Sequence, residues 1–308
     1  MMRRASSIRQ VTVLCGGFSK EREISLVSGQ AAVKALQAKG FTVSTIDITR
    51  DMGALVSALN VAKPDVVFNA LHGRFGEDGC IQGLLDMMSI PYTSSGRLAS
   101  AAAMDKPVAK RLFASAGIPV AEERIVTVAE AEKGDVMERP YVLKPVNEGS
   151  SVGVKIVRDG DNRPPLSDLG LDDNDPIMAE RFIPGREVTV SVMGSRPLAV
   201  TEITTDRGFY DYEAKYADGG SAHQLPAKLD KPLYDRAMEL SVTAHNVLGC
   251  RGISRADLRF DGDEFYMLEV NTQPGLTPTS LVPEQAAFAG INFEDLVLWM
   301  VEHAQCDA

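Results

Sequence analysis

Residues 10–48, QVTVLCGGFSKEREISLVSGQAAVKALQAKGFTVSTIDI, decide the fold class of this chain. The stretch opens with a β-branched run that ends at Gly16 and Gly17. Apolar residues then recur at helical spacing as far as Gly40, and a second β-branched run follows. A strand, a helix and a second strand in this order predict a parallel sheet. We therefore expect an α/β unit at the start of the chain.

The same alternation continues outward to about residue 100. Residues 52–62 predict a helix, residues 66–71 a strand, and residues 80–88 another helix. Such a sheet has helices on both faces, and its ligands bind at the carboxyl ends of the strands. Two loops lie at such ends, GGFSKERE at residues 16–23 and HGRFGEDG at residues 72–79.

After about Asp105 the pattern changes from alternation to runs of strands. Predicted strands and glycine turns dominate this part, so the whole chain is expected to be α+β. The predicted strands cover residues 119–128, 141–145, 154–157, 178–185, 186–194, 196–204 and a hairpin over 253–271. Helices are predicted at residues 106–117, 233–249 and 293–304, and a long ordered loop at residues 209–227.

Composition excludes several classes of protein. Lys and Arg number 32 against 42 Asp and Glu, so the formal net charge is −10. This balance argues against a large nucleic-acid footprint and against a polybasic membrane surface. No apolar stretch approaches the ~20 residues of a membrane span, and the run at residues 11–15 is too short for a signal-peptide core. The four cysteines are widely separated, which is typical of reduced thiols, so we expect a cytoplasmic protein.

The loop EGSSVGV, residues 148–154, lies between two predicted strands. Backbone N–H groups and hydroxyls in such a loop can bind phosphates, and Lys144 on the preceding strand favours that interpretation. A plain hairpin turn is the alternative, because glycine and serine are common in turns. The chain has no GxxxxGK[ST] motif, so a Walker-type site is not expected.

The hairpin at residues 253–271 carries the sharpest chemical signal. Arg255 and Asp257 share one face of its first strand, and Glu269 and Asn271 share one face of its second. Two carboxylates and an amide suit a hard cation such as Mg²⁺. The alternative is a solvated charged face with ordinary salt bridges.

This metal interpretation depends on strand register. Directly opposed residues in an antiparallel pair lie on the same face. A two-residue loop at 262–263 would place Asp257 opposite Leu268 and leave Glu269 on the other face. A three-residue loop at 262–264 would place Asp257 opposite Glu269. A metal site therefore predicts either an odd loop or a β-bulge in this hairpin.

Together these segments resemble the D-alanine–D-alanine ligase family of the ATP-grasp superfamily. The resemblance covers residues 11–304 and rests on eight motifs in family order. They are GGFSKEREISLVSG, ALHGRFGEDGCIQGLLD, IPYTSSG, MDK, LKPVNEGSSVGV, FYDYEAKY, SRADLRF and LEVNTQPGLTPTSL. Departures such as TSSG for the more usual TGSG at residues 93–96 are conservative.

The resemblance implies an ATP-grasp fold in three parts. A Rossmann-like parallel α/β domain would span residues 1–105, a central ATP-grasp domain 106–186, and a C-terminal ATP-grasp domain 187–308. The implied reaction joins two D-alanines through a D-alanyl phosphate, at the expense of ATP, for peptidoglycan synthesis. Two Mg²⁺ ions, with Mn²⁺ as an alternative, would assist it. The implied partners are D-alanine, ATP and a second copy of the chain, held through the N-terminal domain.

The resemblance also assigns residues that bind the nucleotide and the metal. Lys106 and Lys144 match phosphate-binding lysines, Ser151 lies at the tip of the loop over the phosphates, and Glu187 matches the ribose-binding glutamate. The adenine hinge falls on Glu180, Arg181, Phe182 and Ile183. The metal ligands are Asp257, Glu269 and Asn271.

The remaining assignments concern the two amino-acid substrates. Glu21 would hold the ammonium group of the first D-alanine, with His72 close to it. Ser150 and Tyr216, with Glu21, would tie the loops over the site. Donors to the oxyanion are Arg255 and the N–H of Gly275, and the second carboxylate would be bound at Ser280 and Leu281.

Three other functions compete with this one. A different ATP-grasp carboxylate–amine ligase should lack the GGFSKEREIS and ALHG segments, which are present. A depsipeptide ligase using D-lactate should have replaced Tyr216, by analogy with relatives, so D-alanine is favoured at the second site. An inactive binding protein should have lost a metal ligand, a phosphate lysine or Arg255.

Overall fold

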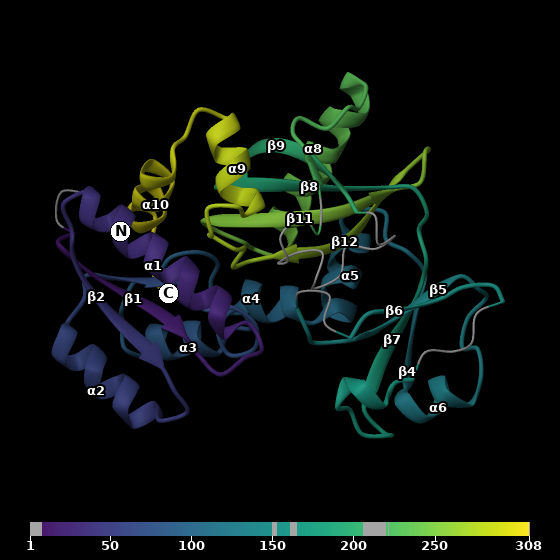
Figure 1. The fold of residues 1–308 in the computed structure, drawn as a ribbon, viewed down its shortest axis with the longest axis horizontal. Coiled ribbons are helices and arrows are strands. Elements are labelled where there is room, and N and C mark those ends of the chain that lie inside the picture. Colours follow the sequence, from purple (N-terminus) through teal and green to yellow (C-terminus); the bar gives the residue numbers. More distant parts are fainter. Residues whose placement is uncertain (1–7, 150–152, 161–164, 206–219, 221, 308) are drawn as a thin grey trace.

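The computed structural model describes residues 8–149, 153–160, 165–205, 220 and 222–307, and these form three sheets (Figure 1). The first sheet contains β1 (Gln10–Gly16), β2 (Thr42–Ile48) and β3 (Val66–Asn69). The second contains β4 (Glu123–Thr127), β5 (Tyr141–Pro145), β6 (Lys155–Val157) and β7 (Pro176–Arg181). The third contains β8 (Arg186–Met193), β9 (Arg196–Thr204), β10 (Ala222–Gln224), β11 (Ile253–Phe260) and β12 (Phe265–Asn271).

Helices connect and cover these sheets. The helices of the first half are α1 (Arg22–Ala38), α2 (Met52–Ala62), α3 (Cys80–Met87), α4 (Arg97–Met104), α5 (Lys106–Ser115) and α6 (Val128–Lys133). Those of the second half are α8 (Lys231–Val247), α9 (Leu281–Phe288) and α10 (Phe293–Glu302). A short 3-10 helix covers Ser167–Leu169.

The first sheet is parallel, in the order β2-β1-β3, as the sequence predicts. Successive residues of β1 point to opposite faces. Val11 and Val13 pack with α1 and α10, whereas Leu14 packs with α2 and α3. The expected helices on both faces are therefore confirmed. The packing of α10 beside α1 joins the two ends of the chain, which the sequence did not predict (Figure 1).

The second sheet is antiparallel, in the order β4-β7-β5-β6. Tyr141, Leu143 and Ile177 are buried beneath α6 and the strands around it. That helix begins at a capping box, in which the Thr127 hydroxyl accepts from the N–H of Glu130 and the Glu130 carboxylate accepts from the N–H of Thr127.

The third sheet is antiparallel, in the order β10-β9-β8-β11-β12. Its apolar face is covered by α5 and α8, with Phe113 and Leu240 in the same core as Leu258 and Met267. Its other face carries polar side chains, among them Thr189 and Asp257. α9 packs against β8 and β9. The sheet therefore has one apolar face packed against helices and one face with buried polar side chains.

The register of β11 and β12 confirms the β-bulge that a metal site requires. Arg255 lies opposite Asn271, and Asp257 lies opposite Glu269. Nearer the loop, Leu258 lies opposite Met267, so the register shifts by one residue between Asp257 and Leu258. The loop itself covers residues 261–264, so the bulge, not a three-residue loop, brings the two carboxylates to one face.

Two helices, α6 and α9, and the short strand β10 lie where the sequence analysis predicted no such element, and β10 falls within residues 209–227, which were expected to be a loop. α6 is short, and α9 follows a loop rich in proline and threonine. The expected domain boundaries at residues 105/106 and 186/187 stay a prediction. β8 begins at Arg186, beside the second of them.

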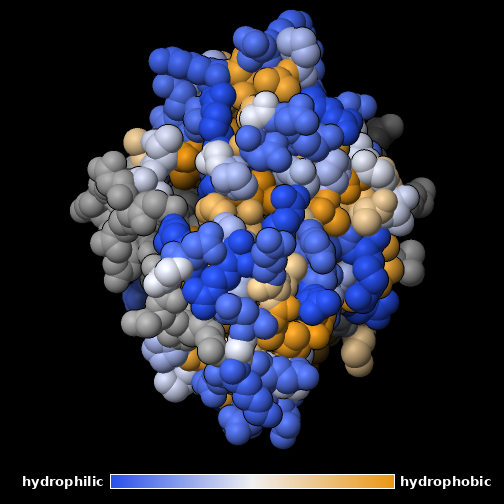
Figure 2. All heavy atoms as spheres, turned by 90° about the vertical axis from the view of Figure 1, so that its right-hand side faces the viewer, coloured by the Kyte–Doolittle hydropathy of each residue, from blue (hydrophilic) through white to orange (hydrophobic). Residues whose placement is uncertain are grey.

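The surface seen from the side of the four-stranded sheet is mostly hydrophilic, with small separate hydrophobic patches (Figure 2). Within the described part of the chain, no helix combines the length and apolar character needed to cross a bilayer.

Candidate active site

One pocket lies between the four-stranded and five-stranded sheets. Nearly all the residues expected to bind nucleotide and metal line it. They are Lys106, Lys144, Glu180, Arg181, Phe182, Ile183, Glu187, Asp257 and Glu269. Val142, Val154 and Leu268 add apolar wall to the same pocket. Mixed apolar and charged lining of this kind suits a ligand with a flat ring and an anionic tail.

Glu180 is the buried centre of the charges on the four-stranded sheet. Its carboxylate lies 2.6 Å from Lys144 Nζ and 2.5 Å from Lys110 Nζ. Lys110 is also 2.8 Å from Glu123. Burial alone would raise the pKa of Glu180, but the two ammonium groups outweigh it and the pKa lies below its ordinary value. Lys144 is therefore held in a fixed position at the pocket wall.

Lys106, the first residue of α5, reaches the same pocket from the opposite side. Its ammonium group donates to the carbonyl of Glu148, at the start of the glycine loop. It also lies 3.8 Å from Glu269 Oε2 on β12. Lys106 therefore connects the glycine loop to the carboxylates of the hairpin.

The hinge residues and Glu187 are held by Arg259 of β11. Its guanidinium group lies 3.1 Å from Glu187 and donates to the carbonyls of Ile183 and Gly185. It also lies over the ring of Phe182, at 5.6 Å from the ring centre. Arg181 instead faces Tyr266. One arginine thus fixes the segment expected to contact adenine and ribose.

Asp257 is surrounded by three donors on the polar face of the sheet. Arg255 donates to both carboxylate oxygens, at 2.8 and 2.7 Å. The Thr189 hydroxyl donates to Oδ1 at 2.6 Å, and the Asn271 amide to Oδ2 at 3.1 Å. The predicted metal ligands and the predicted oxyanion donor therefore form one cluster with Thr189, which the sequence analysis missed.

A second polar layer supports this cluster from α9. The β8–β9 pairing is bulged on β9, where Leu198 and Ala199 lie opposite Ser191 of β8, and the Ser191 N–H donates to Gln285 Oε1 at 2.8 Å. The amide of Gln285 donates to the carbonyl of Thr189 and to the hydroxyl of Thr201. Gln285 thus satisfies a backbone group that the bulge leaves without a strand partner, and it fixes Thr189 beneath Asp257.

Glu21 and His72 lie together at the carboxyl ends of β1 and β3. Ser19 donates to the carbonyl of His72 at 2.7 Å, and Ser28 lies 3.2 Å from His72 Nε2. A Cβ on Gly73 would lie only 2.7 Å from Glu21 Oε2, so the backbone after His72 packs directly on that carboxylate. Burial lowers the pKa of His72 to about 4, which leaves the imidazole neutral at pH 7.

Glu77 is a further carboxyl group at this end, which the sequence analysis missed. It accepts from the N–H of Gly73 at 2.9 Å. A Cβ on Gly149 would lie 3.2 Å from Glu77 and 3.8 Å from Glu21. Burial, followed by repulsion from Glu21, raises the pKa of Glu77 well above its ordinary value. The start of the glycine loop therefore lies over two carboxyl groups.

The loop after β12 reaches back to the first sheet. Gln273 donates to the carbonyl of Asn69 at 2.7 Å. Ser280 precedes α9, and its hydroxyl lies 2.7 Å from that of Thr277 and accepts from the Thr277 N–H. A Cβ on Gly275 would lie 3.0 Å from that hydroxyl, and Leu281 is buried beside it. Gly275, Ser280 and Leu281 are therefore neighbours, as expected.

Three of the expected residues, Ser150, Ser151 and Tyr216, lie outside the described residues. The sequence analysis missed Lys110, Glu77 and Thr189. Each of them lies beside site residues that are far away in sequence. Only Glu77 had a local signal, since it is an acid in a glycine-rich loop after a strand.

Family profiles match most of the chain. The profile described as D-ala D-ala ligase C-terminus matches residues 112–302, and that described as D-ala D-ala ligase N-terminus matches residues 53–95. Among curated relatives, D-alanine--D-alanine ligase of Rhodospirillum rubrum is 60% identical, over 97% of this chain and 99% of its own. The protein of the same name from Paramagnetospirillum magneticum is 59% identical, with the same coverage.

Solved structures show the same likeness. D-alanine--D-alanine ligase from Bacillus anthracis, complexed with ATP, has a TM-score of 0.80 at 28% identity and covers 96% of this chain and 97% of its own. VanG D-Ala:D-Ser ligase from Enterococcus faecalis has a TM-score of 0.80 at 29% identity, covering 96% and 99%. The fold expected from the sequence is thereby confirmed as ATP-grasp. With its geometry, its profiles and its relatives in agreement, the chain belongs to the D-alanine–D-alanine ligase family of ATP-dependent ligases.

Proposed function

We propose that this chain joins two D-alanines into D-alanyl-D-alanine at the expense of ATP, with the residues described above in the roles that follow. The observation that carries the proposal is the bulged register of β11 and β12. It places Asp257 opposite Glu269 and Arg255 opposite Asn271, on the face that Lys106 approaches. A solvated charged face would not need this register, nor the donors that surround Asp257.

The proposed chemistry has two steps. A carboxylate oxygen of the first D-alanine attacks the γ-phosphorus of ATP, and ADP leaves. The amine of the second D-alanine then attacks the carbonyl carbon of the acyl phosphate. Inorganic phosphate leaves and the amine loses a proton, so an amide forms. A carboxylate does not form an amide in water without such a leaving group, and the reacting centre must exclude water or the acyl phosphate hydrolyses.

Lys106 and Lys144 bind the phosphates in this proposal, and Ser151 closes over them. Glu187 binds the ribose, while the backbone of the hinge at Glu180, Arg181, Phe182 and Ile183 contacts the adenine. Lys144 and Glu187 are held in place by their ion pairs. Preorganised charges of this kind stabilise phosphoryl transfer without reorganising during the reaction.

The donor set at the hairpin fits two Mg²⁺ ions, or Mn²⁺ in their place. Asp257 and Glu269 supply carboxylates and Asn271 supplies an amide oxygen, all from one face of paired strands. Oxygen ligands of this type suit hard divalent cations, which keep several positions for phosphate oxygens and water. When bound, the ions would neutralise charge on the phosphates.

At the substrate end, Glu21 binds the ammonium group of the first D-alanine. His72, neutral and held by Ser28, orients it. Arg255 and the N–H of Gly275 stabilise the oxyanion, and Ser280 and Leu281 bind the second carboxylate. Ser150 and Tyr216 join Glu21 in closing the loops over the site.

Specificity for the second amino acid rests on Tyr216, by analogy. The overall fold does not decide it, because a D-Ala:D-Ser ligase shares the fold with the same TM-score as a D-Ala–D-Ala ligase. We therefore assign D-alanine, rather than D-serine or D-lactate, on the sequence of the FYDYEAKY segment alone, which contains Tyr216.

The experiment that tests the function is phosphate release from ATP and Mg²⁺ with D-alanine, beside L-alanine alone and D-alanine plus D-lactate, with products identified by mass. Formation of D-alanyl-D-alanine from D-alanine alone supports the proposal. A depsipeptide at neutral pH would show that Tyr216 does not decide the second substrate. Absence of turnover by folded protein that binds ATP would assign the chain to another ligase activity or to a binding function.

Three further expectations belong to the same proposal. The chain is divided at residues 105/106 and 186/187, it acts in the cytoplasm, and it forms a homodimer through the N-terminal domain. Six of the eight large hydrophobic side chains that are well exposed in the described residues lie in the part of the chain expected to form the dimer. These are Val27, Met52, Val61, Phe75, Met87 and Leu98. Sedimentation velocity measures the oligomeric state directly.

A further inference from the structure

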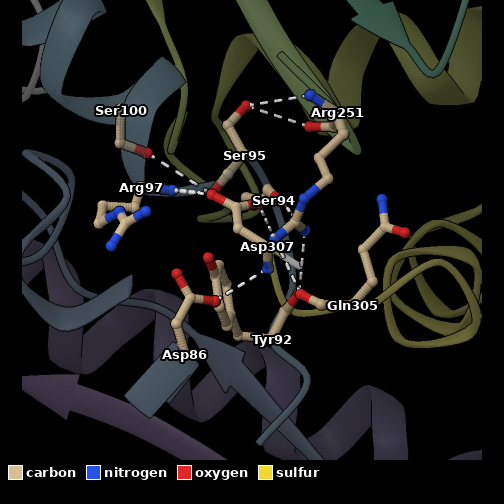
Figure 3. A network of polar contacts seen from close by, with 9 residues as sticks. All are labelled: Asp86, Tyr92, Ser94, Ser95, Arg97, Ser100, Arg251, Gln305 and Asp307. Carbon is tan, nitrogen blue, oxygen red and sulfur yellow. Dashed lines mark hydrogen bonds and ion pairs between the residues drawn. The ribbon is translucent and has the colours of Figure 1, made fainter. Parts of the chain in front are cut away.

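The C-terminal segment, residues 304–307, forms a polar junction with residues that lie far away in sequence (Figure 3). Gln305 pairs with Tyr92 through two backbone hydrogen bonds of 3.2 and 3.4 Å. Arg251, two residues before β11, donates to the carbonyls of Gln305 and Ser94 at 2.8 and 2.7 Å. The segment thus joins the edge of the first sheet to the start of β11.

Asp307 supplies the N-cap that α4 does not have in its own sequence. The N-cap residue of α4 is Gly96, which has no side chain to accept from the helix. Asp307 Oδ2 accepts from the N–H of Arg97 at 2.7 Å instead, across 210 residues of sequence. A Cβ on Gly96 would lie 2.0 Å from Asp307 Oδ1, so only glycine leaves room for this carboxylate. An anionic acceptor at this place stabilises the first turn and the helix dipole.

α4 lies next to two residues of the candidate site, Lys106 and Glu269. α4 ends at Met104, and Asp105 both follows α4 and caps α5 by accepting from Val108 N at 3.0 Å. Lys106 is the first residue of α5. α4 also packs against β12, the strand that carries Glu269, and Lys106 lies 3.8 Å from that carboxylate. One short helix is therefore the common support of a phosphate-binding lysine and a metal-binding carboxylate.

We propose that Asp307 is a positioning residue for Lys106, which it fixes by capping α4, and that the C-terminal segment thereby contributes to nucleotide affinity. The inference rests on the proposed function, because it takes Lys106 to bind the phosphates of ATP. Asp307 itself does not line the nucleotide pocket. Asp307 Oδ1 also lies 3.4 Å from Arg251, two residues before β11, so its effect on the ligand can pass through α4 or through the start of β11, and only the first route runs through Lys106.

The test is the dissociation constant for ATP in the presence of Mg²⁺, measured by calorimetry on the full chain. We expect Asp307→Ala to weaken ATP binding about fivefold, the change that a typical cap energy produces when it is fully coupled. Asp307→Asn keeps an acceptor oxygen, so it should stay within about twofold of the unmodified protein. The KM for D-alanine should not change, which separates positioning of Lys106 from general loss of structure.

Two further variants make the test specific. Asp295→Ala also removes a carboxylate, one in α10 that lies 2.5 Å from Lys39 at the C-cap of α1, and it leaves α4 untouched, so ATP affinity should not change. In a Lys106→Ala background, Asp307→Ala should add almost nothing, because coupled residues are not additive. Equal losses from Asp307→Ala in both backgrounds, or no loss in either, would overturn the inference. An unmodified protein that binds no ATP would instead overturn the proposed function.

Discussion

The two ends of the site hold their buried carboxyl groups in opposite ways. At the nucleotide end, Glu180 lies between Lys144 and Lys110, and its pKa is lowered. At the substrate end, Glu77 lies beside Glu21, and its pKa is raised by burial and by that neighbour. The first arrangement fixes strands and lysines before any ligand arrives. The second places two carboxyl groups, one of them with its neutral form favoured, where the ammonium group of an amino acid would bind.

The largest expected effect is at the nucleotide end. Glu180→Gln removes the shared partner of two buried lysines, so we expect a loss of about 3–5 kcal/mol in the free energy of unfolding. Urea denaturation measures it. Glu123→Gln is the matched control, because among the described residues Glu123 forms an ion pair with one of these lysines, Lys110, and its side chain is partly exposed. Equal, small losses from both variants would show that the pairing at Glu180 is not what holds this end together.

Arg255 and Arg259 lie on one face of β11. Substituting each of them should affect a different kinetic constant, and so distinguish the two ends of the site. Arg255→Ala should lower kcat by about 10²–10³, the usual effect of losing an oxyanion donor. Arg259→Ala should mainly raise the KM for ATP, because its partners are Glu187 and the hinge. Steady-state kinetics on both variants decides it. A loss of less than tenfold for folded Arg255→Ala would remove that residue from the proposed role.

A smaller effect is expected at Thr189, beside the proposed metal ligand Asp257. Thr189→Val keeps the shape but removes a hydrogen bond to a charged group, so binding of Mn²⁺ should weaken by about tenfold. Thr189→Ser retains the hydroxyl and should bind nearly normally. Titration with Mn²⁺, followed by its electron paramagnetic resonance signal, needs no turnover. Equal affinities in the two variants would contradict a role for Thr189 in positioning Asp257.

The smallest effect concerns pH, and its sign differs between the ends. The lowered pKa of Glu180 means that the unfolded chain binds more protons, so its contribution to stability is lost as pH falls below about 4.5. The raised pKa of Glu77 means that the folded chain binds more protons, so stability falls as pH rises above about 4.5. Melting temperatures across pH 4–8 should show a shallower fall for Glu77→Gln than for the unmodified protein. An identical slope would show that Glu77 does not titrate as proposed.

Local pattern predicted the elements of the first sheet well. The β1–α1–β2 stretch follows its hydrophobic period, and the α2 boundaries coincide with the predicted ones. More could be predicted for the hairpin. Asp257 and Glu269 can share one face only if the loop has an odd number of residues or a strand has a bulge, so a metal site restricts the register. α9 was missed because the prolines and threonines before it resemble a continuing loop. Its N-cap is Ser280, a residue that the sequence analysis assigned to substrate binding.

Long-range packing accounts for the rest. Nothing in the sequence near Glu180 shows that Lys110, seventy residues earlier, shares its carboxylate. Thr189 looks like an ordinary strand threonine until β8 pairs with β11. The capping of α4 by Asp307 depends on α10 folding back onto the first sheet. Sequence periodicity reports which face of an element is buried, but it does not report which distant polar groups meet there.

The bulge in β12 also bears on how this enzyme family could diversify. Leu268 is the residue that β12 has in excess, since no residue of β11 lies opposite it, and it lines the nucleotide pocket. Deleting it would leave Glu269 opposite Asp257 and every core residue on its own face. Deleting Met267 would place Leu268 in the core position opposite Leu258, whereas deleting Glu269 would remove the carboxylate opposite Asp257. At position 268, therefore, the length of β12 can vary as well as the side chain. Protein engineers could use this position to reshape the wall of the pocket while Asp257 and Glu269 stay opposite each other.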